Sequence, residues 1–327
     1  MPIPHSKTTV LPFKAPDFPA RGELSDSFMR EFVRFAGDGN ACAELFPNGK
    51  SAIAAALADI GVSSGDEVVL PTYVCHEVLD AVVYSGARPV LCDISSDDWM
   101  LSTDSVGRKL THRTRAVVAP HMFGIRCDVA ALDGLGVAIV EDCAQLLASG
   151  PSPCRYSAYS FHATKWISTG EGGALVKRGG SLSTRSLFLS AFTEYQAESG
   201  LRQLRAYGDF LDRRKCIAAR YFSEFGRAAS RLHGLCDRYL PFRFPLWLER
   251  DIQFDNIRKE FESRGICVRR GVDDLLHRRL GIPDDDFQNA VQAFNHTLSI
   301  PIYPSMTDDE VECVISHVKS LLETEVV

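Results

Sequence analysis

The chain has 327 residues, of which 45% are hydrophobic and 24% are charged, and its formal net charge is −6. This length leaves room for two domains, and the composition is typical of a globular protein. The negative charge argues against a general nucleic-acid binder, because no basic excess exists to neutralise phosphates. No apolar run reaches the roughly eighteen residues that a membrane span needs, and residues 1–14 lack a signal-peptide core. We therefore expect a cytoplasmic protein with no nucleic-acid or membrane partner.

The cysteines are scattered along the chain and form no Cys-x-x-Cys pair. Outside a secretory context such cysteines are expected to be reduced thiols. Their spacing does not match that of a metal-binding site, so no metal is expected.

The first half of the chain alternates short apolar runs with helical patterns. Strands are predicted at 67–70, 89–93, 115–119, 137–142, 158–161 and 174–177, and helices at 51–60 and 76–84. This alternation favours an α/β fold with a largely parallel sheet flanked by helices. Ligands of such sheets bind at the carboxyl ends of strands, where Asp142 and, a few residues after another strand, Lys165 are placed.

The second half predicts a smaller α+β domain. Residues 193–230 are polar and helix-permissive, 239–247 form a strand interrupted by prolines, 250–264 an amphipathic helix and 266–270 a short strand. Thr307 and Glu310 fit a capping box that begins the last helix. We predict an N-terminal arm over 1–20, a large domain over 21–205 and a small C-terminal domain over 206–327.

Three local features predict chemistry. The turn Asn48-Gly49-Lys50 precedes an alanine-rich helix, and a glycine-containing turn there presents free backbone N–H groups to an anion. Taken alone, a plain helix cap is the simpler interpretation. Asp142 ends an apolar strand, where a carboxylate is costly unless paired. A pyridinium N–H is one suitable partner, and a structural cap for the next helix is an equal alternative.

Lys165 is the third feature. It follows Ser160 and Thr164, whose hydroxyls suit a phosphate, and precedes the glycine-rich bend 169–174. Burial and nearby cations can lower the pKa of such a lysine and free its amine to form an imine. A lysine taken alone is usually a solvated surface residue, but the three features together are more specific.

Segments spread over most of the chain resemble one family. They are NGKSAIAAAL, GVSSGDEVVLPTY, YSGARPVLCDI, APHMFGIRCD, VEDCAQ, YSFHATKWISTGEGGAL, TEYQAESGLRQL and LSIPIYPSMTDDEV. With them the chain resembles the DegT/DnrJ/EryC1/StrS sugar aminotransferases, which are fold-type-I (aspartate-aminotransferase-like) enzymes. The resemblance implies pyridoxal 5′-phosphate (PLP) as cofactor, with its amine form PMP as intermediate, and a homodimer. It also implies amino transfer from an amino acid, expected to be glutamate, to a keto group of a sugar or sugar-nucleotide-like substrate.

The resemblance also implies roles for single residues. Lys165 would form the Schiff base with PLP and then shuttle a proton, and Asp142 would pair with the pyridine nitrogen. Gln145 would lie near the ring hydroxyl. Ser160, with the backbone of Gly49 and Lys50, would hold the phosphate.

Several positions depart from the family pattern. Cys75 replaces an aromatic residue that stacks on the cofactor ring, which leaves Tyr73 or His76 as candidates. Core packing is an equal alternative for Tyr73. Trp166 replaces an asparagine. In the family, the stretch that matches 189–192 carries an asparagine that reaches the cofactor of the partner subunit, and this chain lacks it. The loop before this stretch is shorter than in the family. The N-terminal segment is also abbreviated. Lys50 replaces a small hydroxyl residue, so its ammonium could contact the phosphate; a solvated lysine is the alternative.

Two other functions are compatible with parts of this pattern. The dehydratase branch of the family carries histidine at the lysine position, so Lys165 favours transfer. A non-catalytic ligand-binding or regulatory descendant would not need Asp142, Ser160 and Lys165 together. No GxGxxG follows a predicted strand, which argues against a nicotinamide dehydrogenase. Arg270, beside Arg269 and near His277, is a candidate for a substrate carboxylate, although a surface strand position is the simpler interpretation.

Overall fold

The computed structural model describes residues 3–5, 22–182 and 192–325. Most of the predicted N-terminal arm lies outside the described residues, as do Leu189, Ser190 and Ala191 of the stretch that departs from the family. Among the described helices, none is both long and apolar enough to cross a membrane.

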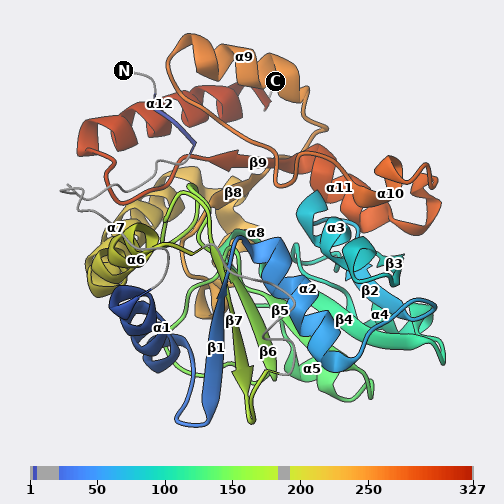
Figure 1. Cartoon of the computed structure of the whole chain (residues 1–327). Coiled ribbons are helices and arrows are strands. Elements are labelled where there is room, and N and C mark those ends of the chain that lie inside the picture. The colour runs from blue at the N-terminus through green and yellow to red at the C-terminus, as the bar shows by residue number, and fades with distance from the viewer. Residues whose placement is uncertain (1–2, 6–21, 183–191, 326–327) are drawn as a thin grey trace.

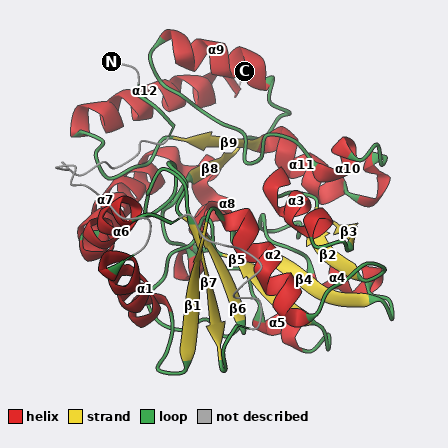
Figure 2. Ribbon diagram, viewed as in Figure 1, coloured by secondary structure: helices red, strands yellow, loops and turns green. Residues whose placement is uncertain are grey.

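A seven-stranded sheet forms the larger part of the molecule (Figures 1 and 2). Its strands are β1 (Ala41–Phe46), β2 (Glu67–Pro71), β3 (Arg88–Cys92), β4 (Thr114–Pro120), β5 (Ala138–Asp142), β6 (Tyr156–Ser160) and β7 (Gly173–Arg178), in the order β1-β7-β6-β5-β4-β2-β3. Strands β3, β2, β4, β5 and β6 are parallel, whereas β7 is antiparallel to both of its neighbours. The predicted α/β fold with a largely parallel sheet is confirmed.

Helices cover this sheet. They are α1 (Glu23–Ala36), α2 (Gly49–Ile60), α3 (His76–Tyr84), α4 (Thr103–Lys109), the short η1 (Met122–Gly124) and α5 (Ala130–Asp133). Helix α2 packs on β5, β6 and β7, and its small residues from Ala52 to Ala56 are buried on all sides. Helix α1 packs on β1 and on α6 (Glu194–Arg205). The central strands are therefore shielded on both faces, and all five residues of β2 are buried.

A second, smaller layer lies across one end of the sheet. It contains α7 (Tyr207–Phe225), η2 (Gly226–Ala229), α8 (Ser230–His233), η3 (Cys236–Arg238), β8 (Phe244–Trp247), α9 (Phe254–Ser263), α10 (Leu276–Arg279), η4 (Asp284–Asp286), α11 (Gln288–His296), β9 (Thr297–Ile300) and α12 (Asp308–Glu325). Strands β8 and β9 pair antiparallel, and α9 and α12 lie over them in Figure 1. Helix α6 packs on α1, whereas α7 packs on α12, which agrees with a division near residue 206. That domain boundary stays a prediction.

The capping box of the last helix is confirmed. The Thr307 N–H donates to Glu310 Oε2 at 2.9 Å, and the Glu310 N–H donates to Thr307 Oγ1 at 3.1 Å. The predicted strand at 266–270 is wrong. Among the described residues, this segment forms two isolated bridges, one between Ile266 and Ile3 and one between Arg269 and Ser299, and these do not add up to a strand.

One edge of the large sheet collects the predicted site residues. Strand β1 runs parallel to β6, because β7 is antiparallel to both. The carboxyl ends of β1, β2, β4, β5 and β6 therefore lie at one edge, where β7 begins. Asn48, Cys75, His121, Asp142 and Lys165 all follow or end these strands.

Candidate active site

Lys165 lies in the connection between β6 and β7, which backbone hydrogen bonds close tightly. The Ala163 N–H donates to the Gly170 carbonyl at 2.9 Å, and the Lys165 N–H donates to the His162 carbonyl at 2.9 Å. The Lys165 Nζ lies 5.9 Å from the centre of the Phe242 ring. Burial, together with the charge of Arg243, lowers the pKa of Lys165. The neutral, nucleophilic amine is therefore more accessible than in a solvated lysine.

Asp142 ends β5 with only 8% of its surface exposed. Its Oδ1 accepts a hydrogen bond from the Ala144 N–H at 2.9 Å. Burial raises the pKa of Asp142, and the hydrogen bond from the Ala144 N–H opposes this rise only in part. Within the described part of the chain, no cation lies at ion-pair distance from its carboxylate. A buried carboxylate of this kind suits a cationic N–H donor.

The turn before α2 faces the end of β6. Asn48 Oδ1 accepts from the Ser51 N–H at 2.9 Å and caps the helix, as the simpler interpretation predicts. A Cβ atom added to Gly49 would lie 2.9 Å from the Cβ of Ser160, so only glycine allows this approach. The cap satisfies a single N–H of the first turn. The remaining N–H groups and the Ser160 hydroxyl are thus placed for one anion.

The ammonium of Lys50 is paired with carboxylates, whereas a contact with the phosphate was hypothesised. Its Nζ lies 2.7 Å from Glu77 Oε2 and 3.9 Å from Asp80 Oδ2. The hydrogen bond to Glu77 raises the pKa of Lys50. The pairing favours a surface ion pair over a phosphate contact, although the backbone of Lys50 stays in the turn.

The two candidates for ring stacking occupy unlike surroundings. Tyr73 is fully buried, and the close approach of Gly271 to its ring leaves no room for a side chain there. This packing favours a core role for Tyr73. His76 begins α3 at the surface, with its Nε2 3.4 Å from Glu77 Oε1. Cys75 lies between them in the chain, and the charges of both Lys165 and Asp142 act on its thiol.

Two further predicted residues lie beside Lys165 and Asp142 in the chain. Gln145 Oε1 accepts from the Phe123 N–H at 2.8 Å. The Thr164 hydroxyl lies 3.4 Å from His162 Nδ1. Neither contact engages the whole side chain, so each keeps hydrogen-bonding capacity. Their cofactor contacts stay predictions.

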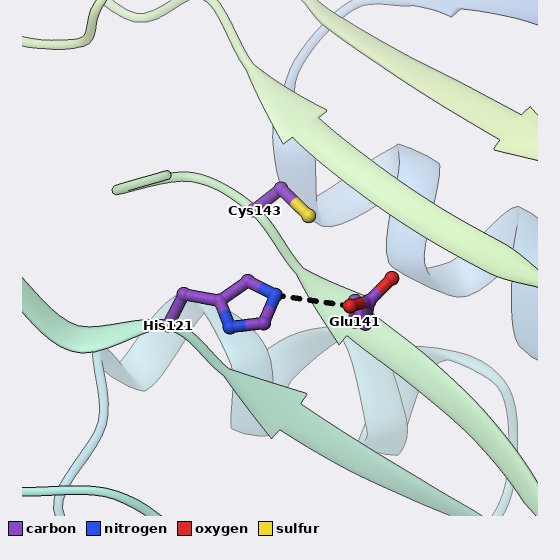
Figure 3. Close-up of side chains that lie close together, drawn as sticks. All are labelled: His121, Glu141 and Cys143. Atoms are coloured by element: carbon purple, nitrogen blue, oxygen red, sulfur yellow. Dashed lines mark ion pairs between the residues drawn. The ribbon is translucent and has the colours of Figure 1, made fainter. Parts of the chain in front are cut away.

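A buried polar cluster lies at the ends of β4 and β5 (Figure 3). His121 Nε2 lies 3.2 Å from Glu141 Oε1, and Cys143 is the third member. His121 Nδ1 accepts from the Cys127 N–H at 3.0 Å, which assigns the ring proton to Nε2, facing Glu141. Burial would raise the pKa of Glu141, but hydrogen bonds from His121 and two serine hydroxyls outweigh it and lower the pKa.

These serines are Ser152 and Ser157, and both donate to Glu141 Oε2. The carboxylate therefore already accepts hydrogen bonds on Oε2, and the N–H of the His121 ring faces Oε1. We interpret His121, Glu141 and Cys143 as a polar support for the strand that carries Asp142, rather than as a metal centre.

Trp166 packs in a cluster of aromatic and cationic side chains that the sequence did not predict. Its Nε1 donates to the Gln145 carbonyl at 3.0 Å, and its ring packs against Phe242 and Tyr207. The buried Arg214 lies over the same ring, with its Cζ 4.8 Å from the ring centre. An aromatic and cationic unit thus replaces the asparagine expected next to Lys165.

Arg270 is engaged away from Lys165. Its Nη1 donates to the Phe294 carbonyl at 2.7 Å, and its guanidinium lies over the rings of Phe254 and Phe294. These contacts give Arg270 a structural role, but the surface strand position expected for it is wrong, because Arg270 lies in no strand and packs on two rings. Arg243 instead acts on Lys165, and sequence reasoning missed it. A signal existed, because a lone arginine between Phe242 and Phe244 in an apolar, proline-flanked run is costly unless it is used.

This set of residues fits PLP. The desolvated amine of Lys165 suits the aldehyde of PLP. The buried carboxylate of Asp142, which has no cationic partner among the described residues, suits the pyridinium nitrogen. The helix N-terminus that faces the Ser160 hydroxyl suits the phosphate. Each functional group of the cofactor thus has a chemically suited counterpart at the same edge of the sheet.

Comparison with known proteins leads to the same chemistry. Residues 13–193 and 189–319 match the DegT/DnrJ/EryC1/StrS aminotransferase family. The spore coat polysaccharide biosynthesis protein SpsC of Bacillus subtilis (strain 168) is 27% identical over 363 aligned residues, covering 93% of this chain and 91% of the relative. GDP-perosamine synthase of Vibrio cholerae is 25% identical over 341 residues, covering 92% and 91%. The solved structure of DesV from S. venezuelae shares the fold, with a TM-score of 0.81, 24% identity and coverage of 93% and 90%.

Proposed function

We propose that this chain, which belongs to the DegT/DnrJ/EryC1/StrS aminotransferase family, uses Lys165 to move an amino group from an amino acid, expected to be glutamate, to a keto sugar. As a member of this family it is an aminotransferase, and its cofactor is PLP. The observation that carries the proposal is the convergence of Lys165, Asp142 and the Gly49–Ser160 contact at one edge of the sheet.

The chain's own residues supply the positioning and the proton transfer. When bound, PLP supplies the electron sink for negative charge at the reacting carbon. Lys165 Nζ, with its lowered pKa, would attack the cofactor carbonyl as a neutral amine and later carry a proton to or from the substrate carbon. The Asp142 carboxylate would accept a hydrogen bond from the ring N–H. Ser160 and the first turn of α2 would hold the phosphate.

The acceptor is proposed to be a keto group on a sugar or sugar-nucleotide-like molecule. The support is the family and the GDP-perosamine synthase relative, whose name describes a nucleotide-linked sugar. We further propose a homodimer, which is typical of this fold. A cytoplasmic location is proposed because all ten cysteines are free thiols. Light scattering of the purified protein tests the dimer, and a monomeric mass would contradict it.

Absorbance spectra test the cofactor assignment. Protein supplied with PLP should show a cofactor band, and borohydride should fix the cofactor to the peptide that carries Lys165. Lys165→Ala should lose this covalent label, whereas the matched control Lys109→Ala, which removes a lysine paired with Asp286, should keep it. No band at saturating PLP would favour a non-catalytic ligand-binding protein.

The transfer itself is tested with the amino donor. Glutamate should convert the bound cofactor to its amine form and release 2-oxoglutarate, and a keto sugar nucleotide should restore the starting spectrum. Release of ammonia or water elimination from the sugar, without 2-oxoglutarate, would instead indicate the dehydratase type of chemistry.

A further inference from the structure

The loop between β2 and α3, residues 72–75, leaves the sheet at the edge where the site residues gather. Strand β2 ends at Pro71 and α3 begins at His76. The far end of the loop adjoins the turn before α2, because Glu77 in the first turn of α3 pairs with Lys50 at 2.7 Å. The course of this loop therefore sets how α3 meets the turn that faces Ser160.

Thr72 is the residue through which the smaller layer holds this loop. Its N–H donates to the Cys92 carbonyl at 2.9 Å, and its carbonyl accepts from the Leu276 N–H at 3.0 Å. Its hydroxyl accepts from the His277 N–H at 3.0 Å and lies 2.7 Å from Nδ1 of the same histidine. Because Thr72 is fully buried, its polar atoms depend on these contacts. Most of them come from the first two residues of α10.

The His277 ring joins this threonine to a carboxylate. Its Nε2 lies 2.8 Å from Asp284 Oδ1, and Arg278 donates to both oxygens of the same carboxylate. The hydrogen bonds from Arg278 and His277 lower the pKa of Asp284, so this carboxylate is an acceptor at neutral pH. In the neutral imidazole Nε2 therefore carries the proton, and Nδ1 accepts from the Thr72 hydroxyl. Asp284 thus sets the direction of the hydrogen bond at Thr72.

Packing holds the histidine and the loop in this arrangement. The His277 side chain is fully buried, and its ring stacks on Phe287 with the ring centres 4.3 Å apart and the planes at 12°. Gly271, also in the smaller layer, approaches the ring of Tyr73 so closely that no side chain fits there. A buried polar chain whose members are all hydrogen-bonded fixes one orientation, which an apolar contact of the same size would not do.

We infer that His277 is a positioning residue for the transfer reaction, which holds the loop 72–75 beside the cofactor site through the Thr72 hydroxyl; this rests on the proposed function. Thr72 and His277 are both buried, so they act through the loop and not on the substrate. The loop leads into α3, whose first turn pairs with Lys50 of the turn before α2. Reacting groups tolerate little displacement, since a shift of about 1 Å can cost roughly 100-fold in rate.

Substitutions of the threonine test this role on protein saturated with PLP. Thr72→Val keeps the shape of the side chain without the hydroxyl, and should slow single-turnover conversion of the bound cofactor by glutamate about 10- to 100-fold. Thr72→Ser keeps the hydroxyl and should recover most of the rate. The matched control Thr114→Val removes a buried hydroxyl at the start of β4, at the opposite edge of the sheet, and should react like the parent chain. Equal rates in Thr72→Val and Thr114→Val would overturn the inference.

Two substitutions of His277 separate its two ring contacts. The amide of asparagine falls near the place of Nδ1 and can still accept from Thr72, whereas the amide of the longer glutamine falls near the place of Nε2 and faces Asp284. His277→Asn should therefore keep more of the rate than His277→Gln. The reverse order would show that the contact with Asp284 matters instead. This pair decides the question if Thr72→Val does not fold.

Circular dichroism of the bound cofactor gives a readout that needs no amino donor. The sign and strength of the cofactor band depend on how its ring is held, so Thr72→Val should change this band at saturating PLP, whereas Thr72→Ser and Thr114→Val should keep it. A lower melting temperature with an unchanged band would show a purely structural role and overturn the inference. If the band changes but glutamate converts no cofactor in the parent chain, the positioning role stands and the proposed transfer fails.

Discussion

Replacing Arg214 with methionine should destabilise the protein by about 3 kcal/mol. Arg214 is buried in α7 and donates to the carbonyls of Pro241, Phe242 and Ile302 at 3.1, 2.8 and 2.8 Å. Burial lowers the pKa of Arg214 to about 10, so the group remains charged at neutral pH. Methionine keeps much of the apolar stem but none of the donors.

The size of the effect follows from these contacts. Each buried carbonyl left without a donor costs about 1–3 kcal/mol, and a desolvated cation over an aromatic ring contributes about 1–2 kcal/mol. The substitution also removes the cost of burying the charge of Arg214, which offsets several kcal/mol of this loss. The net loss is therefore about 3 kcal/mol, well below the sum of the separate contacts.

Urea unfolding of the cofactor-free protein measures this loss, with the slope checked for constancy. Arg220→Met on the same helix is the matched control, because Arg220 forms a partly exposed ion pair with Glu312 at 2.6 Å. Such a pair is worth less than about 1 kcal/mol. If Arg214→Met were no less stable than Arg220→Met, the three carbonyl contacts would not stabilise the fold as argued.

Three further substitutions or conditions probe the site itself. Burial raises the pKa of Asp142, so its contribution to stability is present at low pH and is lost as pH rises through the folded pKa. At neutral pH, cofactor-free Asp142→Asn should therefore melt at or above the parent temperature by calorimetry while binding PLP more weakly; a clearly lower melting temperature would contradict this. Gly49→Ala places a methyl 2.9 Å from the Ser160 Cβ and should weaken PLP binding about tenfold in a fluorescence titration. Capture of PLP, followed by stopped-flow absorbance, should accelerate as pH rises through the lowered pKa of Lys165, and Arg243→Gln should move this midpoint upward by removing a neighbouring cation.

Sequence patterns predicted the large sheet well because its central strands are short apolar runs with polar boundaries. The six predicted strands differ from the observed ones by two residues or fewer at every end. Asp142 and Lys165 could be placed together because parallel strands end at one edge of a sheet. Strand β1 was missed because Ala41–Phe46 is poor in β-branched residues and only partly buried.

The walls of the site could not be predicted in the same way. Arg243 lowers the pKa of Lys165 although the two residues are far apart in the chain, and no local pattern encodes an effect between such distant segments. The cation over Trp166 comes from α7 for the same reason. Long-range packing of single side chains is set by the whole core, so family resemblance and periodicity give the cofactor chemistry but not its surroundings.

Two departures from the family pattern, Cys75 and Trp166, each lie near charged side chains. Cys75 replaces a large aromatic ring with a small thiol, and the charge of Arg243 reaches that thiol as well as Lys165. Trp166, which follows the lysine in the chain, is larger than the residue it replaces, and Arg214 and Phe242 pack against it. A site changed in this way keeps the lysine and the aspartate that the cofactor needs, while the residues next to them in the chain differ from the family pattern.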